Sequence, residues 1–449
     1  NTVVHTFTAS GYLTPFVNFN NSLRFRKSVS ANLTRTPTVA SNRTTWTWSG
    51  WIKRGTIGDA IQYLFGHYNG TNITAIYLPT SGTIEFEYYD GTNNPYLLTS
   101  AVYRDPAAWY HIVAVFDTTN ATAADRMRLF VNGSRVTAFS ASANPNQNQN
   151  GFVNSTVAHA IGSRSDSASY FDGYMTNINF VDGQALSPYA FGNFNSYGVW
   201  APVAYSGSYG TNGFLLNFGN TANTTALGYD SSPQGNNWTT NNFSLTAGST
   251  YDSMVDVPTL TSANVANYAV LNPLAILGVK ATITNGNLSA TGQNSAYCAA
   301  LSTIGMSTGK FYFEATVTGY SGSADQIGVL LADATKLVSG VSNPWYYSTD
   351  YAFLGNGNKY NNNSGTSASA FTFGLNDVVG VAFDADAGTL QVNKNGGSFT
   401  TIFTSIPAGT YLFGTSTYAT SDVIAANFGQ RPFAYTPPSG YVALNTYNM

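Results

Sequence analysis

The chain has 449 residues, of which 9% are charged and 14% are aromatic, and its formal net charge is −3. So many aromatic residues with so little net charge exclude a disordered chain, and the lack of a basic stripe excludes nucleic acid as a partner. Glu, which surface helices use heavily, occurs only at three positions, Glu85, Glu87 and Glu314. The composition therefore predicts an all-β protein.

The residue types that form covalent or metal cross-links are scarce. Cys298 is the only cysteine, so an internal disulfide framework is excluded and we expect this residue to be buried.

No run of 18 apolar residues occurs, and no membrane insertion is predicted. The chain starts without Met, which indicates a processed protein or part of a longer polypeptide. No cofactor is expected.

The N-terminal part predicts a first β-sandwich. Residues 1–19 are a lead segment with one short strand. Residues 20–220 contain short apolar runs separated by turn signals, which is typical of sandwich strands. In the stretch 45–55, Trp46 and Trp48 stand two positions apart, and therefore on one face of a strand.

Two stretches, 109–136 and 377–397, repeat one pattern. Each has an apolar run ending in Phe-Asp, a polar loop, and a second run with the sequence Leu-x-Val-Asn. Asn-Gly pairs follow at 132–133 and at 395–396, and they supply the positive φ that a tight turn needs. The pattern predicts one type of hairpin used in two separate sandwiches.

The first half resembles a known superfamily. WYHIVAVFD, RLFVNGSRV and GYMTNINFVDGQALSP occur in this order. Together they resemble the laminin-G-like branch of the concanavalin A-like lectin/glucanase superfamily, over the stretch 22–195. The resemblance implies a jelly roll of two antiparallel sheets.

Residues 221–266 are predicted to be an ordered connector. They are rich in Gly, Asn and Ser, but they also contain the large apolar residues Trp238, Phe243 and Met254. A flexible tether would lack such anchors, so we expect these side chains to be buried. Just before the connector, the alternating apolar residues of 214–218 predict a strand that returns to the first sandwich.

The remaining residues, 267–449, predict a second sandwich. Three stretches resemble the SPRY (B30.2-like) sandwich in their sequence and order: GKFYFEA, DVVGVAFDADAGTLQVNKNGG and NFGQRPF. The predicted fold is therefore two tandem antiparallel jelly-roll β-sandwiches, laminin-G/concanavalin A-like and then SPRY-like. This tandem, joined by a connector with SPQGNNW and YDSMVDVPT, resembles structural proteins of tailed bacteriophages.

Glu85 and Glu87 are the candidates for catalysis. They share one face of a strand, and a retaining glycanase needs two carboxyl groups about 5–5.5 Å apart. The glycanase motif of the superfamily has a third carboxylate further along the face, where this chain has Tyr89. We therefore interpret the pair as a solvent-facing edge and predict no catalytic residue.

No metal site is predicted. The histidines do not lie at metal-ligand spacing: His5, His67, His111 and His159. The resemblance implies that His111 serves in sheet packing. The loop 384–388 looks like part of a calcium loop but lacks further ligands, so it is interpreted as a turn. The laminin-G resemblance makes Asp117 and Asp172 candidate rim ligands, yet Thr176 stands where many relatives have Asp.

The candidate ligand-binding residues lie in the stretch 343–366. The SPRY resemblance implies a binding surface at one end of the sandwich, and here it would contain Trp345, Tyr346, Tyr347 and Tyr360. Aromatic faces among Asn and Ser suit a neutral sugar or an adaptable protein contact. The alternative is that Trp345 and Tyr347 are core residues under a long loop.

The sequence favours a non-enzymatic bacteriophage structural protein located in the virion, as a fibre, spike or head decoration. Its expected partners are a host-surface glycan or other virion proteins, within a homo-oligomer for which a trimer is one candidate. The alternative is a bacterial secreted or cell-surface adhesin or carbohydrate-binding protein, and a glycan hydrolase is the least favoured. Capsid and tail genes beside the coding sequence would distinguish the first from the second.

Overall fold

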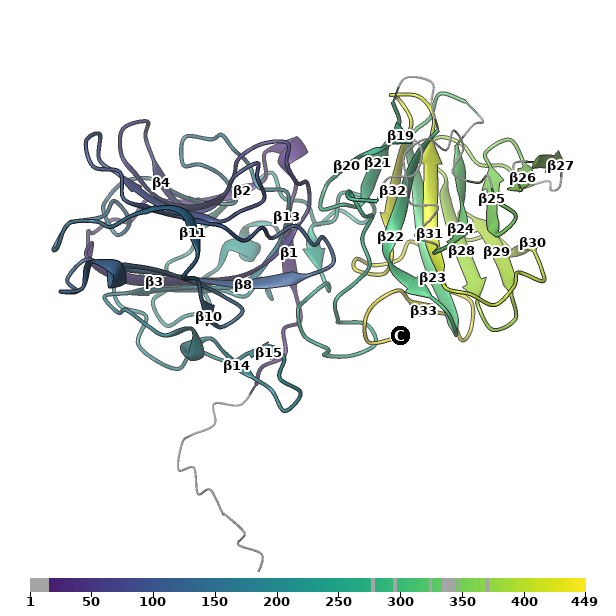
Figure 1. Cartoon of the computed structure of the whole chain (residues 1–449). Helices are drawn as coiled ribbons and strands as arrows, with labels where there is room; N and C mark the ends of the chain where they lie inside the picture. Colours follow the sequence, from purple (N-terminus) through teal and green to yellow (C-terminus); the bar gives the residue numbers. More distant parts are fainter. Residues whose placement is uncertain are drawn as a thin grey trace, which may run out of the picture.

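The computed structural model describes residues 16–275, 279–293, 297–322, 325–332, 345, 347–362, 364–367 and 371–449. Two β-sandwiches lie side by side in Figure 1, the first in purple to teal and the second in green to yellow. The only helices in the described ranges are short 3-10 helices: η1 (Lys27–Val29), η2 (Ala123–Asp125), η3 (Pro188–Ala190) and η4 (Thr225–Gly228). None of the described helices is long and apolar enough to cross a membrane. The all-β prediction is confirmed.

The first sandwich consists of two sheets. Sheet I has the order β10 (Ser134–Arg135), β9 (Met127–Val131), β8 (Trp109–Asp117), β3 (Thr45–Arg54), β13 (Gly173–Asp182), β1 (Ser22–Phe25) and β18 (Ser253–Met254), with β16 (Phe214–Leu216) also on β13. Sheet II has the order β11 (Phe139–Ala143), β7 (Tyr96–Thr99), β6 (Glu85–Tyr89), β5 (Ile73–Leu78), β4 (Gln62–Tyr68), β12 (His159–Ile161), β2 (Asn32–Arg35) and β17 (Thr239–Asn241). A two-stranded sheet joins β14 (Gly192–Phe194) to β15 (Trp200–Pro202).

Aromatic side chains fill the space between sheets I and II. Trp46 and Trp48 are fully buried, as their shared face predicted. The Trp46 ring stacks on Phe116 and the Trp48 ring on Phe65, with centroids 5.5 and 6.1 Å apart. Each buried aromatic side chain removes a large apolar area from water, so these rings contribute much of the stability of the sandwich.

The second sandwich also has two sheets. Sheet III has the order β19 (Val279–Lys280), β22 (Cys298–Met306), β31 (Tyr411–Thr417), β24 (Gln326–Leu331), β25 (Asp350–Leu354), β26 (Asn358–Asn361) and β27 (Ser364–Ser367). Sheet IV has the order β20 (Thr282–Thr284), β21 (Ser289–Thr291), β32 (Val423–Asn427), β23 (Lys310–Gly319), β28 (Val378–Asp384), β29 (Thr389–Lys394) and β30 (Thr400–Phe403), with β33 (Val442–Ala443) on β23. Among the pairings of described strands, β19 with β22 and β23 with β33 are parallel, and the others are antiparallel.

The two predicted hairpins have the same turn. Asn132 and Asn395 have φ of 48° and 51°, and the glycines after them have φ of 80° and 74°. The Asn132 backbone N–H donates to the His111 carbonyl oxygen, and its side-chain oxygen accepts from the His111 N–H, both at 2.8 Å. Asn395 makes the same two bonds to Val378, also at 2.8 Å. The repeat in sequence is therefore a repeat in backbone geometry.

The connector is held by its large apolar residues and by sheet pairing. Trp238 and Phe243 are 3% and 9% exposed, which confirms that they are anchors. The Trp238 ring lies 5.0 Å from that of Phe214, and the Phe243 ring 5.2 Å from that of Phe25. Strands β17 and β18 of this segment pair with β2 and β1, so it adds to both sheets of the first sandwich.

A buried lysine joins the first sandwich to the start of the second. Lys53 on β3 has no exposed surface. Its Nζ donates to Asp256 Oδ2, Asn267 Oδ1 and the Tyr268 carbonyl oxygen at 2.7–2.8 Å. Asp256 Oδ1 in turn accepts from Trp109 Nε1 at 3.1 Å. All three ammonium protons are used, which is what burial of such a charge requires.

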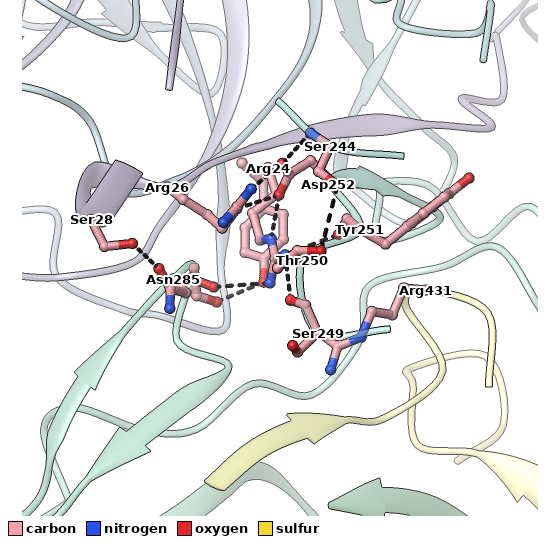
Figure 2. A network of polar contacts seen from close by, with 12 residues as sticks. Arg24, Arg26, Ser28, Ser244, Ser249, Thr250, Tyr251, Asp252, Asn285 and Arg431 are labelled. Atoms are coloured by element: carbon pink, nitrogen blue, oxygen red, sulfur yellow. Dashed lines mark hydrogen bonds and ion pairs between the residues drawn. The ribbon is translucent and has the colours of Figure 1, made fainter. Parts of the chain in front are cut away.

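A second buried ionic contact joins Asp252 to two arginines (Figure 2). Asp252 accepts hydrogen bonds from Arg24 Nε at 3.0 Å and from Arg26 Nε and Nη2 at 2.8 and 2.9 Å. Arg24 Nη1 also donates to the Asn285 carbonyl oxygen, in the turn between β20 and β21, at 3.4 Å. One carboxylate therefore fixes two strand-end arginines, and one of these reaches the second sandwich.

The same turn contacts Asp172 of the first sandwich. The Asp172 carboxylate accepts from the backbone N–H of Gly286 at 2.7 Å and of Asn285 at 3.1 Å. Tyr174 Oη donates to the Gly286 carbonyl oxygen at 2.6 Å. Burial raises the pKa of Asp172, and the backbone donors act against that rise. These hydrogen bonds hold the turn between β20 and β21 of the second sandwich against the N-terminal end of β13.

Candidate functional site

The outer face of sheet II gathers tyrosine and glutamate side chains. Along β6, Phe86 points into the core while Glu85 and Glu87 point to the other side. The strand register places Glu85 opposite Tyr77 on β5, and Glu87 opposite Tyr96 on β7. We call this surface the Tyr–Glu face and define it by the residues that point outward from β4 to β7: Tyr63, Tyr68, Tyr77, Glu85, Glu87, Tyr89 and Tyr96.

The tyrosines of one side of this face hold each other in place. The rings of Tyr63 and Tyr77 stack with centroids 4.7 Å apart, and Tyr68 meets Tyr63 edge to face at 6.3 Å. Tyr63 and Tyr77 are 6% and 7% exposed, whereas Tyr89 and Tyr96 are half-buried. The last two therefore have ring surface available to a ligand.

The two glutamates are half-buried and share the surroundings of Tyr77. Tyr77 Oη donates to Glu87 Oε2 at 2.9 Å. Burial raises the pKa of Glu85 and of Glu87, and a hydrogen bond from Tyr77 opposes the rise. Strand β6 lies between β5 and β7 in the interior of the sheet. The pair therefore points away from the core, as interpreted, but it lies on an interior strand and not at an edge, because adjacency in sequence does not reveal which strands flank β6.

The cation of Arg164 lies at the rim of the Tyr–Glu face. The Arg164 guanidinium lies 3.9 Å from the centre of the Tyr68 ring and makes a bidentate bond to Asp166. Because Asp166 neutralises this cation, the two glutamates dominate the charge of the face. Carboxylate oxygens accept hydrogen bonds from hydroxyl groups, and tyrosine rings pack on apolar ring faces. The arrangement suits an uncharged polyhydroxylated ligand and disfavours an anionic one.

The predicted loop residues lie in different surroundings. Trp345 has no exposed surface and belongs to a cluster with Leu301 and Leu330 of sheet III. Tyr360 is half-buried and packs against the same cluster. The backbone oxygen of Tyr347 accepts from the N–H of residues 350 and 362, and Tyr346 lies outside the described residues. Trp345 is therefore a core residue, as the alternative interpretation stated for it, whereas Tyr347 is half-buried.

His111 has the packing role that was expected. It lies between the rings of Trp51 and Trp200, at centroid distances of 4.8 and 5.9 Å. Trp200 Nε1 donates to His111 Nδ1 at 2.9 Å, so the proton of this imidazole is on Nε2, 2.8 Å from Ser49 Oγ. Burial lowers the pKa of His111 to about 3. A neutral, fully engaged imidazole has no free nitrogen for a metal or a proton transfer.

The other flagged acids also have structural partners. Asp384 Oδ1 accepts from the N–H groups of residues 386 and 387, and Lys310 Nζ lies 2.9 Å from its Oδ2. Asp117 Oδ1 accepts from Thr119 Oγ1 at 2.6 Å. Across the described ranges, no group of three or more His, Cys, Asp or Glu side chains could hold a metal ion.

The tyrosines of the Tyr–Glu face were not singled out from the sequence. The alternation in TIEFEYYD identifies one strand face, but Tyr63 and Tyr77 lie on two other strands. Only the pairing of β4, β5 and β6 shows that they adjoin the glutamates. The recurrence of tyrosine in four consecutive short strands was the available signal.

Comparisons with known proteins agree with this architecture. Residues 28–189 match the family model described as the concanavalin A-like lectin/glucanases superfamily, and residues 310–431 match that of the SPRY domain. The predicted fold class is thereby confirmed. Domains of these two kinds fit a carbohydrate-binding or protein-interaction role. No curated protein matches the chain.

Solved structures similar to parts of the chain are distant. The SPRY domain of human HERC1 is 17% identical, with 35% of this chain and 96% of that chain covered and a TM-score of 0.30. A heptameric SAP-like pentraxin from Limulus polyphemus is 19% identical, with 38% and 80% covered and a TM-score of 0.28. Stonustoxin is 18% identical, with 36% and 27% covered and a TM-score of 0.27.

Proposed function

We propose that this protein is a non-enzymatic structural component of a bacteriophage particle that binds an uncharged host-surface glycan through the Tyr–Glu face. The observation behind this proposal is that half-buried Tyr89 and Tyr96 lie on the same face of one sheet as two acceptor carboxylates, with Tyr96 directly opposite Glu87. A sheet holds such groups in fixed positions, so a ligand does not have to order them on binding. The protein repeats in the particle as a homo-oligomer.

Two features of the sequence support a place in the virion. The connector between the sandwiches resembles that of tailed-phage structural proteins, and neither type of domain requires such a segment. The charged fraction of 9% also leaves a surface of Asn, Thr, Ser and Gly, which tolerates contact with neighbouring subunits. Gold-labelled antibody against the protein should decorate intact particles in electron micrographs, and unlabelled particles would contradict this location.

Glycan binding is tested with the full-length protein. We expect it to bind host cells and their neutral envelope polysaccharide, and we expect Tyr96→Ala to weaken that binding about tenfold, equivalent to ~1.4 kcal/mol. Tyr197→Ala is the matched control, because Tyr197 is an 88% exposed tyrosine at the turn between β14 and β15. Equal binding by Tyr96→Ala, Tyr197→Ala and the parent protein would remove the Tyr–Glu face from the proposal.

The absence of catalysis is tested on the same face. We expect no cleavage of laminarin, agar or host polysaccharide by the purified protein. Glu85→Gln and Glu87→Gln keep the shape of each side chain but remove its ability to act as an acid or a nucleophile. Hydrolysis that either substitution abolishes would show that the protein is an enzyme and overturn this part of the proposal.

A further inference from the structure

One edge of β13 is shared by two strands that do not meet. Strand β1 pairs with residues 173–175 of β13, and β16 pairs with residues 178–180. Between them lie Thr176 and Asn177, where the pairing with β3 on the other edge also shifts register. Asn177 has a φ of 48°, a conformation that an L-residue rarely adopts inside a strand. The strand switch therefore opens a gap in sheet I.

A cavity of about 220 Å³ occupies this gap. The chain entering β1, the bulge of β13 and the chain around β16 line it: Val17, Asn18, Phe19, Asn20, Asn21, Asn177, Asn179, Ala204, Tyr205, Leu215, Asn217 and Gly219. Because water takes roughly 30 Å³ per molecule in the liquid, this volume corresponds to roughly seven waters. One pyranose ring is a ligand of the right order of size.

The chemistry of the lining selects uncharged ligands. None of the lining residues is acidic, basic or a histidine, and six of them are asparagines. Asn179 is already engaged, since its Oδ1 accepts from Tyr209 Oη and its Nδ2 donates to the Asn177 carbonyl oxygen. The side chains of Asn18, Asn20 and Asn177 make no hydrogen bond to another described residue. Each amide offers one acceptor and two donors, which matches hydroxyl groups and leaves a charged group without a counter-ion.

Tyr205 supplies a fixed aromatic wall. Its ring packs on Phe191 and Tyr209 at centroid distances of 5.3 and 5.1 Å. Its hydroxyl donates to the Ser208 carbonyl oxygen at 3.0 Å and accepts from Gln184 Nε2 at 3.4 Å. Because these contacts fix the Tyr205 ring, a ligand does not have to order it on binding. Tyr205 is half-buried and lines the cavity, so part of its surface is accessible to a ligand there.

We propose that this cavity is a second sugar site, which binds one neutral monosaccharide unit through the free asparagine amides with the Tyr205 ring as its apolar wall. It lies on the outer face of sheet I, and the Tyr–Glu face lies on the outer face of sheet II, so the two sites are on opposite sides of the sandwich. The two-residue gap in the edge of β13 is too short to accept an added peptide strand, which usually has three or more residues. The site does not depend on the Tyr–Glu face.

The test is saturation-transfer NMR and calorimetry on the full-length protein. The probes are glucose, galactose, mannose and N-acetylglucosamine, with glucuronic acid and glucosamine as charged counterparts. A contact surface of one ring predicts a Kd on the order of 1 mM for at least one neutral sugar, and no binding of the charged ones. The proposal would be overturned if none of the neutral sugars binds at about 10 mM, which is ten times the expected Kd.

Two variants locate the binding. Asn177→Gly removes the amide but tolerates the positive φ, so the bulge is kept. Asn20→Ala removes an exposed amide that makes no hydrogen bond to another described residue. Each should weaken binding of the neutral sugar at least fivefold with an unchanged circular dichroism spectrum, whereas Tyr197→Ala, which lies outside both proposed sites, should leave that binding unchanged. Weakening by Tyr96→Ala alone would assign the sugar to the Tyr–Glu face and overturn the second site.

Discussion

Asp325, next to the start of β24, is a carboxyl group enclosed by protein. It has no exposed surface, and neither of its oxygens accepts a hydrogen bond from the described residues. Its neighbour Asp422 instead accepts backbone N–H groups of Ser321 and Ala419 at 2.6 and 2.7 Å. Burial and the charge of Asp422 raise the pKa of Asp325 to about 8. At neutral pH Asp325 is therefore protonated and Asp422 is ionised.

This pair predicts a pH dependence of stability. Because the folded pKa of Asp325 is raised, the folded state retains a proton that the unfolded chain releases between pH 3.8 and about 8. The free energy of unfolding thus falls as pH rises through this window, by up to ~1.4 kcal/mol per pH unit. Asp325→Asn keeps the shape without the titration, so its stability relative to the parent should increase with pH. Denaturant unfolding at pH 5 and pH 8 measures this difference, and an equal difference at both would contradict the assignment.

At the scale of single elements, the Asn-Gly turns combine a backbone requirement with close packing. A Cβ on Gly133 would lie 2.4 Å from the Trp200 ring, and one on Gly396 would lie 2.3 Å from the Tyr435 ring. Both glycines also have positive φ. In each case the aromatic residue comes from a later part of the chain. The turn is therefore a point of close contact between the hairpin and a later segment of the same domain.

Gly133→Ala should therefore lower the free energy of unfolding by more than the strain of a positive φ alone would. Gly440 is the matched control, since it has a φ of 84° and nothing within 4 Å of the built Cβ. We expect Gly440→Ala to lower the free energy of unfolding by about 1–2 kcal/mol, and Gly133→Ala to lower it by a further 1–3 kcal/mol because of overpacking. Chemical denaturation of both variants is the measurement. Equal losses would mean that Trp200 moves aside freely.

The connector is an element in its own right. Its Trp238 packs against Phe65 and Phe214 inside the first sandwich. Trp238→Ala should lower the free energy of unfolding by about 3–5 kcal/mol, as for other buried aromatic residues, and should make the segment accessible to protease. In the parent protein, limited proteolysis should spare residues 230–260, and clean cleavage there would contradict the anchored connector.

At the scale of the whole molecule, buried charges join the two sandwiches. The apolar core that contains Phe313 and Phe413 of the second sandwich also includes Trp51, Trp109 and Tyr174 of the first. Within this contact the Lys53–Asp256 pair is closed off from water. Paired charges in such a contact favour one relative position of the two sandwiches, because moving one sandwich against the other would leave a buried charge without its partner.

Asp256→Ala should therefore destabilise the molecule strongly. It leaves the Lys53 ammonium without its counter-charge, and such a loss costs roughly 3–5 kcal/mol. Asp59→Ala is the matched control, because the Lys27–Asp59 pair is about one-third exposed and exposed pairs contribute about 0–1 kcal/mol. Calorimetric unfolding compares the two variants. Similar melting temperatures would show that the junction does not depend on the buried pair.

The sequence by itself determined the features that depend on neighbouring residues. Alternation placed Trp46 and Trp48 in a core, and the Asn-Gly pairs specified tight turns, because side-chain direction and φ are set within a few residues. The isolated apolar residues of the connector likewise indicated that it would be ordered. The all-β class followed from the composition, and the tandem of two sandwiches followed from the repeated hairpin pattern and the two family resemblances.

Only the tertiary structure decided which strands meet. The Tyr–Glu face needs the register of β4 to β7, and the cavity at Asn177 needs β1 and β16 to share one edge of β13. The junction joins Lys53 to Asp256 and Asp172 to Gly286, groups separated by 203 and 114 residues. Such contacts depend on how whole sheets pack, and burial then decides which charges are paired and which pKa values shift. A pattern read along one strand contains no information about its neighbours, and the sites of this protein lie between neighbours.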